Sequence, residues 1–313
     1  MQRSPEPEAG ADPTAEPAAA LAPRLESAAE HGWLRRLATF VAFVVLVVIA
    51  WEAFKFVAGD PWRIGGWEWR PPLDVKQASD LNLPHVWSIV GALVEPVQRN
   101  ADASLAQFLV GAALYTWREA AIGFVAGALL GGGLAALFVH VPLAERALVP
   151  YVIASQTIPI VALAPMIAFA VDDPVVSVVI IATFLTFFPV TISMIRGLRS
   201  PDPRALELMR SYAASRWTVF WKLRLPASVP YLFTALKISA TASIVGAIIG
   251  EGPGGIRFGL GRAIINFNTQ YISGPEKLWA AILASALLGI AFFAIIRLAE
   301  AFVLRGRPDA AAA

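Results

Sequence analysis

Residues 207–226 read ELMRSYAASRWTVFWKLRLP, the most charged and most sharply patterned part of an otherwise apolar chain. Two short helical runs, roughly 204–212 and 216–224, meet at residues 213–215. Basic residues outnumber acidic ones here: Arg204, Arg210, Arg216, Lys222 and Arg224 stand against Asp202 and Glu207. A basic helix–turn–helix between two membrane spans belongs on the cytoplasmic face, because lysine and arginine are retained there.

The composition predicts a membrane protein. Of the 313 residues, 57% are hydrophobic and 15% are charged, whereas soluble domains carry about 25% charged residues. There is no cysteine, which excludes disulfides and thiolate metal sites. The three scattered histidines, His31, His85 and His140, form no ligand cluster, so we expect no metal site. Nothing in the charge distribution suggests nucleic acid as a partner.

Six apolar segments are long enough to cross a bilayer, which takes about 20 residues. They lie at about 37–57, 117–140, 151–171, 175–195, 229–250 and 278–300. We therefore expect an all-α polytopic protein of the cell inner membrane, with both termini cytoplasmic because arginines flank both terminal spans. The predicted parts are a disordered tail (1–30), a first transmembrane helix (31–58), a periplasmic or interfacial segment (59–103), a transmembrane domain (104–305) with a cytoplasmic loop (200–226), and a tail (306–313).

Gly123, Gly127 and Gly131 recur every fourth residue of the second span and so share one helix face. Small residues at this spacing let helix backbones approach closely in lipid. Two interpretations are open: packing within one subunit, or a contact between subunits.

The third span contains polar residues beside prolines. Ser155, Gln156 and Thr157 precede Pro159, and Pro165 follows. Proline frees backbone carbonyls that neighbours must satisfy. The polar cluster therefore either faces a cavity or forms interhelical hydrogen bonds. After it, Asp172 and Asp173 indicate a polar external turn.

Ionisable residues are few in the spans, and we expect those such as Arg118 and Glu119 to lie near the membrane interfaces. Glu251 interrupts the end of the fifth span, where an ionisable group is a functional candidate by default. An interfacial helix-end carboxylate is the equal alternative. The following segment, 251–276, is either an external loop or a re-entrant one.

The sequence contains neither a phosphate-binding G-x-x-x-x-G-K-[ST] loop nor a Ser–His–Asp set, so we expect a transport subunit without its own ATPase site. The informative feature is the loop at 207–226. It either docks on a partner or rests on the lipid headgroups as an amphipathic helix.

This loop resembles the cytoplasmic signature of ABC-importer permeases, which reads E-A-A, then glycine, then L-P. Glu207, Arg210 and Leu225–Pro226 match it, whereas Ala213 stands at the glycine position. Because alanine lacks glycine's easy access to positive φ, we expect a more helical turn. The order of features over 84–305 is similar to the nitrate/sulfonate/taurine-type permeases, including Phe188–Pro189 and Gly250–Glu251.

The resemblance implies a type I importer fold and a coupling loop that docks on a cytoplasmic ABC ATPase dimer, which binds ATP and Mg²⁺. It also implies a periplasmic or lipid-anchored binding protein and a second permease copy, here a homodimer. The implied docking residues are Glu207, Arg210, Ala213, Ala214, Ser215 and Arg216. Gln156, Thr157 and Glu251 are the candidates for the translocation path.

An ion-gradient-driven secondary transporter is the alternative, and it predicts paired charges within the spans. The substrate class implied by the resemblance is a small oxyanion, a sulfonate, or a pyrimidine- or flavin-type precursor. Aromatic and amide side chains that would suit a planar heterocycle are Asn266, Phe267, Asn268, Gln270 and Tyr271.

Overall fold

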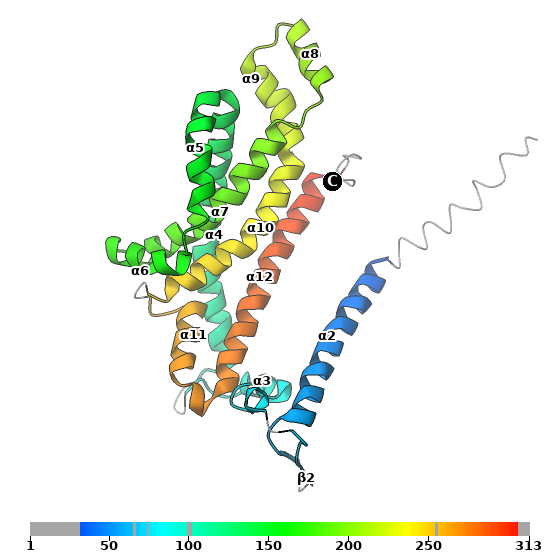
Figure 1. The fold of residues 1–313 in the computed structure, drawn as a ribbon, viewed down its shortest axis with the longest axis vertical. Helices are drawn as coiled ribbons and strands as arrows, with labels where there is room; N and C mark the ends of the chain where they lie inside the picture. Colours follow the sequence, from blue (N-terminus) through cyan, green and yellow to red (C-terminus); the bar gives the residue numbers. More distant parts are fainter. Residues whose placement is uncertain (1–31, 65–66, 74, 99–101, 254–255, 306–313) are drawn as a thin grey trace, which may run out of the picture. The chain divides into compact units, whose positions relative to one another are not determined.

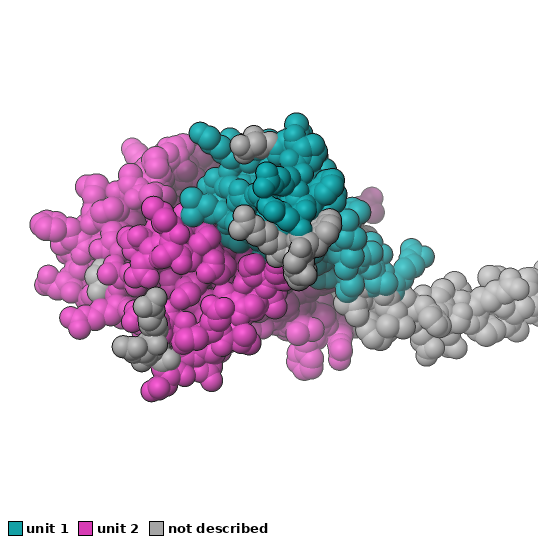
Figure 2. All heavy atoms as spheres, turned by 90° about the horizontal axis from the view of Figure 1, so that it is seen from below, with its two compact units in different colours: residues 1–86 teal, residues 87–313 magenta. Residues whose placement is uncertain are grey.

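A computed structural model describes residues 32–64, 67–73, 75–98, 102–253 and 256–305 of the chain. These divide into two compact units, within residues 1–86 and 87–313 (Figure 2). The tails predicted at 1–30 and 306–313 lie outside the described residues.

The first unit consists of helix α2 (Gly32–Ala58), the two-stranded hairpin β1 (Trp62–Ile64) and β2 (Trp67–Trp69), and the 3-10 turn η1 (Lys76–Ala78). Charged side chains fix the end of α2. The fully buried Lys55 ammonium donates to the Asp80 carboxylate and the Leu83 carbonyl. Glu52 accepts from His85 and from the Val86 N–H at 2.7 and 2.8 Å. These bonds join the C-terminal half of α2 to the segment that follows the hairpin.

The second unit is helical (Figure 1). Its elements, in order, are α3 (Val86–Ala92), α4 (Leu105–His140), α5 (Pro142–Ser155), α6 (Ile160–Ala170), α7 (Pro174–Leu198), α8 (Pro203–Ser211), α9 (Arg216–Val219), the π-helical turn η2 (Phe220–Arg224), α10 (Leu225–Glu251), α11 (Leu260–Thr269), the 3-10 turn η3 (Tyr271–Ser273) and α12 (Pro275–Val303). Helices α4, α7 and α10 pack against one another, and α12 packs on α10.

Among the described residues, five helices are long and apolar enough to span a membrane, and six if α5 and α6 together count as one. The predicted span count and the helical fold class agree with this. The second span, however, is much longer than predicted. Ser104 and Gln107 form a capping box, in which each side chain accepts the other's backbone N–H, and this starts α4 at Leu105.

The predicted third span at 151–171 is wrong as a single helix. Helices α5 and α6 are bent by 100° at a short break. Pro159 stands at the N-cap of α6 in an extended conformation, and a proline has no N–H to continue the preceding helix. Residues 142–150, which lie before the predicted span, form the first part of α5.

The glycine stripe of α4 is a contact within one chain. Cβ atoms placed on Gly123, Gly127 and Gly131 would lie 2.4–2.5 Å from atoms of α7, namely Ala182, Thr186 and Phe187. The threonine hydroxyl of Thr183 also donates to the Gly123 carbonyl, at 3.2 Å. Of the two interpretations, packing within one subunit is confirmed at all three glycines.

We expect Gly127→Ala to destabilise the folded protein by about 1–3 kcal/mol, because the added methyl group overpacks the contact with Thr186. Gly132→Ala on the same helix is the matched control, since its Cβ would meet nothing within 4 Å. Thermal unfolding of the two purified variants in detergent measures the difference. Equal melting temperatures would contradict the packing.

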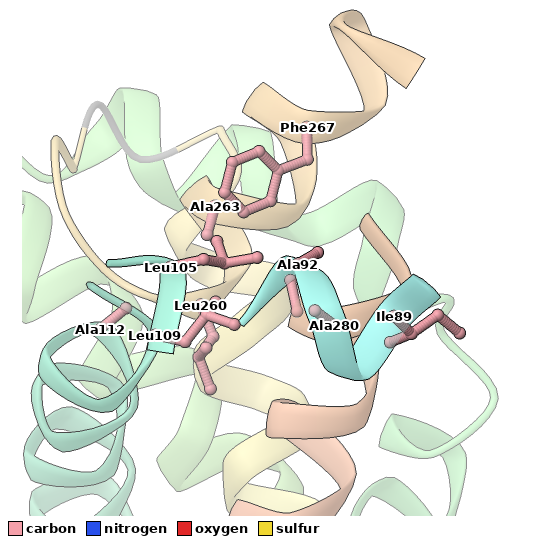
Figure 3. Close-up of a cluster of buried hydrophobic side chains, with 10 residues drawn as sticks. Ile89, Ala92, Leu105, Leu109, Ala112, Leu260, Ala263, Phe267 and Ala280 are labelled. Atoms are coloured by element: carbon pink, nitrogen blue, oxygen red, sulfur yellow. The ribbon is translucent and has the colours of Figure 1, made fainter. Parts of the chain in front are cut away.

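One hydrophobic cluster holds α11 against α3, α4 and α12 (Figure 3). Its α11 members are Leu260, Ala263 and Phe267, and Phe267 is only 6% exposed. The expectation that Phe267 faces a heterocyclic substrate is therefore wrong, because this ring fills the protein core. Asn266, Asn268 and Gln270 are exposed.

Candidate functional site

The loop between α7 and α10 is built from two capped short helices. The Asp202 carboxylate accepts the Arg204 N–H at 2.8 Å and starts α8. The Ser215 hydroxyl accepts the Thr218 N–H at 3.1 Å and starts α9. Both caps satisfy amide groups that a helix N-terminus leaves without partners. Both predicted helical runs are present, but the second is not a separate short helix, because α9 continues through η2 into α10 as one helix, Arg216–Glu251.

The turn between these helices contains an alanine in the left-handed conformation. Ala213 has φ +51°, the one positive φ at a non-glycine residue in the described part of the chain. The Ala214 N–H bonds the Met209 carbonyl at 3.0 Å, and the Ala213 N–H bonds the Arg210 carbonyl at 2.9 Å. These are the two bonds of a Schellman motif, which normally has glycine at this position.

The expectation of a more helical turn is therefore wrong. Its two backbone hydrogen bonds, together with the Ser215 cap that follows at once, favour the left-handed turn. They outweigh the penalty of about 1–2 kcal/mol for an L-residue in this conformation.

The predicted docking residues form an exposed surface. Glu207, Arg210, Ala213, Ser215 and Arg216 are exposed, and Ala214 is half-buried. Helix α8 buries none of its side chains. Large apolar groups are exposed beside these residues as well, among them Leu208 at 57% and Tyr212 at 76%. An exposed apolar patch with a polar rim is typical of a protein-binding surface.

The loop is anchored to the helices on both sides. Phe220 is buried in the cluster shared by α4, α7 and α10. The Arg224 guanidinium donates to the Leu198 carbonyl at the end of α7, at 3.0 Å. The His140 ring, which ends α4, packs on Trp217 and Phe220 with centroid distances of 5.5 and 5.0 Å. The loop is therefore in direct contact with three of the long helices.

A second polar centre lies inside the second unit. Glu251, at the end of α10, is fully buried. Its carboxylate accepts the Thr116 hydroxyl and the Gly261 N–H, both at 2.6 Å. Thr116 in turn accepts the Leu260 N–H at 2.9 Å. Glu251 is thus a helix-end carboxylate, as one interpretation held, but it lies in the protein core.

These contacts form a tertiary cap for α11. Its N-cap residue is Gly259, which has no side chain to accept an amide hydrogen. Glu251 and Thr116 bond the first amides of the helix instead, and a carboxylate there also complements the helix dipole. Gly259 is required because a Cβ would lie 2.5 Å from the Glu251 carboxylate and because its φ is +129°.

Glu119 is a second buried carboxyl group in this unit. It lies within α4 beside Tyr115 and Glu251 and is 1% exposed. Neither carboxylate oxygen has a hydrogen-bond partner among the described residues. Two other ionisable residues of the long helices do form a pair: the Lys237 ammonium of α10 and the Glu300 carboxylate of α12 lie 2.8 Å apart. The expectation that Glu119 lies near a membrane interface stays a prediction, but its burial within the protein was not foreseen.

The other polar candidates lie at helix ends. Gln156 and Thr157 are exposed in the break between α5 and α6. Thr157 bonds the Ala154 carbonyl of its own turn, at 2.7 Å, and not another helix. Asp173 caps α7 by accepting two backbone amides at 2.8 and 3.1 Å, as a polar turn residue would. Among the described residues, no group of three His, Asp or Glu side chains is placed to hold a metal.

Comparison with known proteins decides the family. Residues 123–305, more than half of the chain, match the family described as the binding-protein-dependent transport system inner membrane component. The chain belongs to this family. The match includes the α8–α9 loop and Glu251 but begins after Glu119. The chain is therefore a membrane permease subunit of an ABC importer.

Several similar permeases are named for the solute that they transport. The formylaminopyrimidine transport permease of Halalkalibacterium halodurans is 35% identical over 59% of this chain and 73% of its own length. The riboflavin transport permease of Chloroflexus aurantiacus is 31% identical over 53% of this chain and 61% of its own length. The putative aliphatic sulfonates permease of Bacillus subtilis is 24% identical over 71% and 83%. Permeases of this family work in general with an ATPase and a binding protein.

Proposed function

We propose that the α8–α9 loop is the surface through which a separate ATPase drives this permease. The observation that carries the proposal is the exposed Schellman turn, flanked by two capped helices and anchored to α4, α7 and α10. Docking would involve Glu207, Arg210, Ala213, Ala214, Ser215 and Arg216. ATP and Mg²⁺ would be bound by the partner, since this sequence has no phosphate-binding loop.

The translocation path requires a second permease copy in this proposal. Helices α5 and α6 expose large apolar side chains, including Tyr151 at 74%, Met166 at 67% and Phe169 at 94%. Gln156 and Thr157 lie in the break between these helices. A homodimer that covers this surface would bring the two polar breaks toward a shared path. Both termini would be cytoplasmic, in keeping with the arginines beside the terminal spans.

The substrate class that we propose is a planar nitrogen heterocycle. Support comes from the two relatives of 35% and 31% identity, whose names specify formylaminopyrimidine and riboflavin. The relatives named for sulfonates and nitrate are each 24% identical. The solute would reach the permease on a binding protein. Family membership favours ATP over an ion gradient as the driving force.

Reconstitution tests this function. The chain is co-expressed with its ATPase and purified, and ATP hydrolysis is measured in proteoliposomes with the loaded binding protein. We expect the ATPase to co-purify and the loaded binding protein to stimulate hydrolysis. Failure of the two subunits to associate would contradict the coupling proposal.

The substrate is tested separately by thermal shift of the binding protein with pyrimidines, flavins, sulfonates and small oxyanions. We expect stabilisation by a pyrimidine or a flavin. Stabilisation by a sulfonate or nitrate alone would contradict the heterocycle assignment and leave the coupling proposal intact.

A further inference from the structure

A hollow of about 500 Å³ lies between the α8–α9 loop and the junction of α4 and α5. Three arginines line it, each from a different element: Arg210 from α8, Arg216 from α9 and Arg224 from η2. His140 contributes from the end of α4. No acidic side chain is among the described residues that line the hollow.

No acidic side chain among the described residues neutralises the positive charge in this hollow. Arg210, Arg216 and Arg224 form no ion pair with a described acidic residue. Nearby Arg199 is paired with Glu145 at 2.5 Å, so that carboxylate is already engaged. Arg224 lies close enough to Arg199 and Arg210 to be repelled by both. Like charges held this close are destabilising unless an anion lies between them.

One of the three arginines is oriented by the fold, since the Arg224 guanidinium donates to the Leu198 carbonyl. Arg210 and Arg216 stand on either side of the Schellman turn, whose backbone hydrogen bonds connect α8 to α9. Guanidinium groups present planar pairs of donors that match phosphate oxygens. Three of them around one hollow are therefore suited to a phosphate group.

Aromatic side chains beside the hollow indicate where that phosphate comes from. Trp217 and Trp221 are 66% and 60% exposed next to the lining arginines. Tryptophan is enriched at the membrane interface, and the inner leaflet carries anionic phospholipids that attract basic clusters. We propose that the hollow binds the phosphate group of an anionic phospholipid of the inner leaflet. This inference rests on the proposed function in two ways: the loop is cytoplasmic, and Arg210, Ala214 and Arg216, which are also proposed docking residues, would face the phosphate inside the hollow while the ATPase covers the outer side of the loop.

The bound lipid would stiffen the coupling loop. Its phosphate would link α8 and α9 to the end of α4, across the hollow that now separates them. A ligand that favours one arrangement of a mobile element shifts the population toward it. Import would then respond to the anionic lipid content of the membrane.

Native mass spectrometry of the permease–ATPase complex in an equimolar mixture of phosphatidylglycerol and phosphatidylcholine tests the proposal. We expect the wild-type complex to retain phosphatidylglycerol preferentially. Arg224→Gln should reduce that retention about fivefold, the effect of about 1 kcal/mol per basic residue near the surface. Arg224→Lys should keep most of it. Lys222→Gln, an exposed neighbour on η2 that does not line the hollow, is the matched control.

Three outcomes would overturn the proposal. The wild-type complex could retain both lipids equally, a result that does not depend on any variant's folding. Glycerol 3-phosphate could displace the lipid, which would show a site for soluble phosphates. Arg224→Gln could release the ATPase as well, which would assign the hollow to the docking surface. The proposed function fails by a different result, namely a wild-type chain that binds no ATPase in any lipid.

Discussion

Replacing both Ala213 and Ala214 with glutamate is expected to abolish association with the ATPase and, with it, stimulated ATP hydrolysis. The two methyl groups stand at the tip of the turn, where Ala213 is exposed and Ala214 is half-buried. If an ATPase groove closes over this turn, two carboxylates would be buried there without partners. Truncations and charge changes at such central contacts cost about 2 kcal/mol or more each, which is roughly a 30-fold loss of affinity per site.

The matched control for this experiment is Ala213→Gly. Glycine adopts the observed positive φ without strain, so the variant should keep the ATPase and stabilise the turn by about 1 kcal/mol. Pull-down of the ATPase from detergent extract measures association, and thermal unfolding measures the turn. If the double glutamate variant still binds the ATPase and supports transport, this turn is not the docking surface.

The local signals in the sequence predicted the helices of the α8–α9 loop, with one exception at the turn between them. Asp202 and Ser215 are N-cap residues, and they predict both short helices before any contact is known. The conformation of Ala213 could not be predicted in the same way. Its residue type argues against positive φ, and the hydrogen bonds that impose it depend on where α8 ends.

The helix boundaries were harder to predict. Helix α4 begins at Leu105, whereas the predicted span begins at about 117. The capping box of Ser104 and Gln107 is readable in the sequence and marks the start of α4. The predicted span began at about 117 instead, so Glu119 was expected at a membrane interface and its burial within the protein was not foreseen. From the sequence, Pro159 indicated only that the helix is disturbed there. The 100° angle between α5 and α6 could not be predicted, because it depends on how the two helices pack.

The contacts around Glu251 come from segments far apart in the sequence, which is why no local pattern revealed them. Thr116 and Glu251 are separated by 135 residues, yet they meet at 2.6 Å. From the sequence alone, Gly259 and Gly261 indicated only that no helix continues through this segment. Their role is to let the α11 backbone approach the carboxylate, and a Cβ on Gly261 would lie 2.2 Å from the Ile248 carbonyl.

Glu251→Ala is expected to detach the N-terminus of α11 and strongly destabilise the second unit. The substitution leaves the Gly261 N–H and the Thr116 hydroxyl buried without an acceptor. Each such group costs about 1–3 kcal/mol. The loss of the helix-capping carboxylate adds to this. Thermal unfolding of the purified permease should show a large decrease in melting temperature, and hydrogen exchange should increase first in α11.

Glu119→Gln tests whether stability depends on the capping of α11 by Glu251 or on any buried carboxyl group in this region. Neither oxygen of Glu119 meets the geometry of a hydrogen bond among the described residues, and an amide of the same shape can face its neighbours Tyr115 and Glu251 in the same way. The amide also cannot ionise at this buried position beside Glu251, where a charge would be unfavourable. We therefore expect unchanged or higher stability for Glu119→Gln, in contrast to Glu251→Ala. Equal destabilisation by both variants would mean that the two carboxyl groups act as one bonded pair, and that Glu251 does not cap α11 on its own.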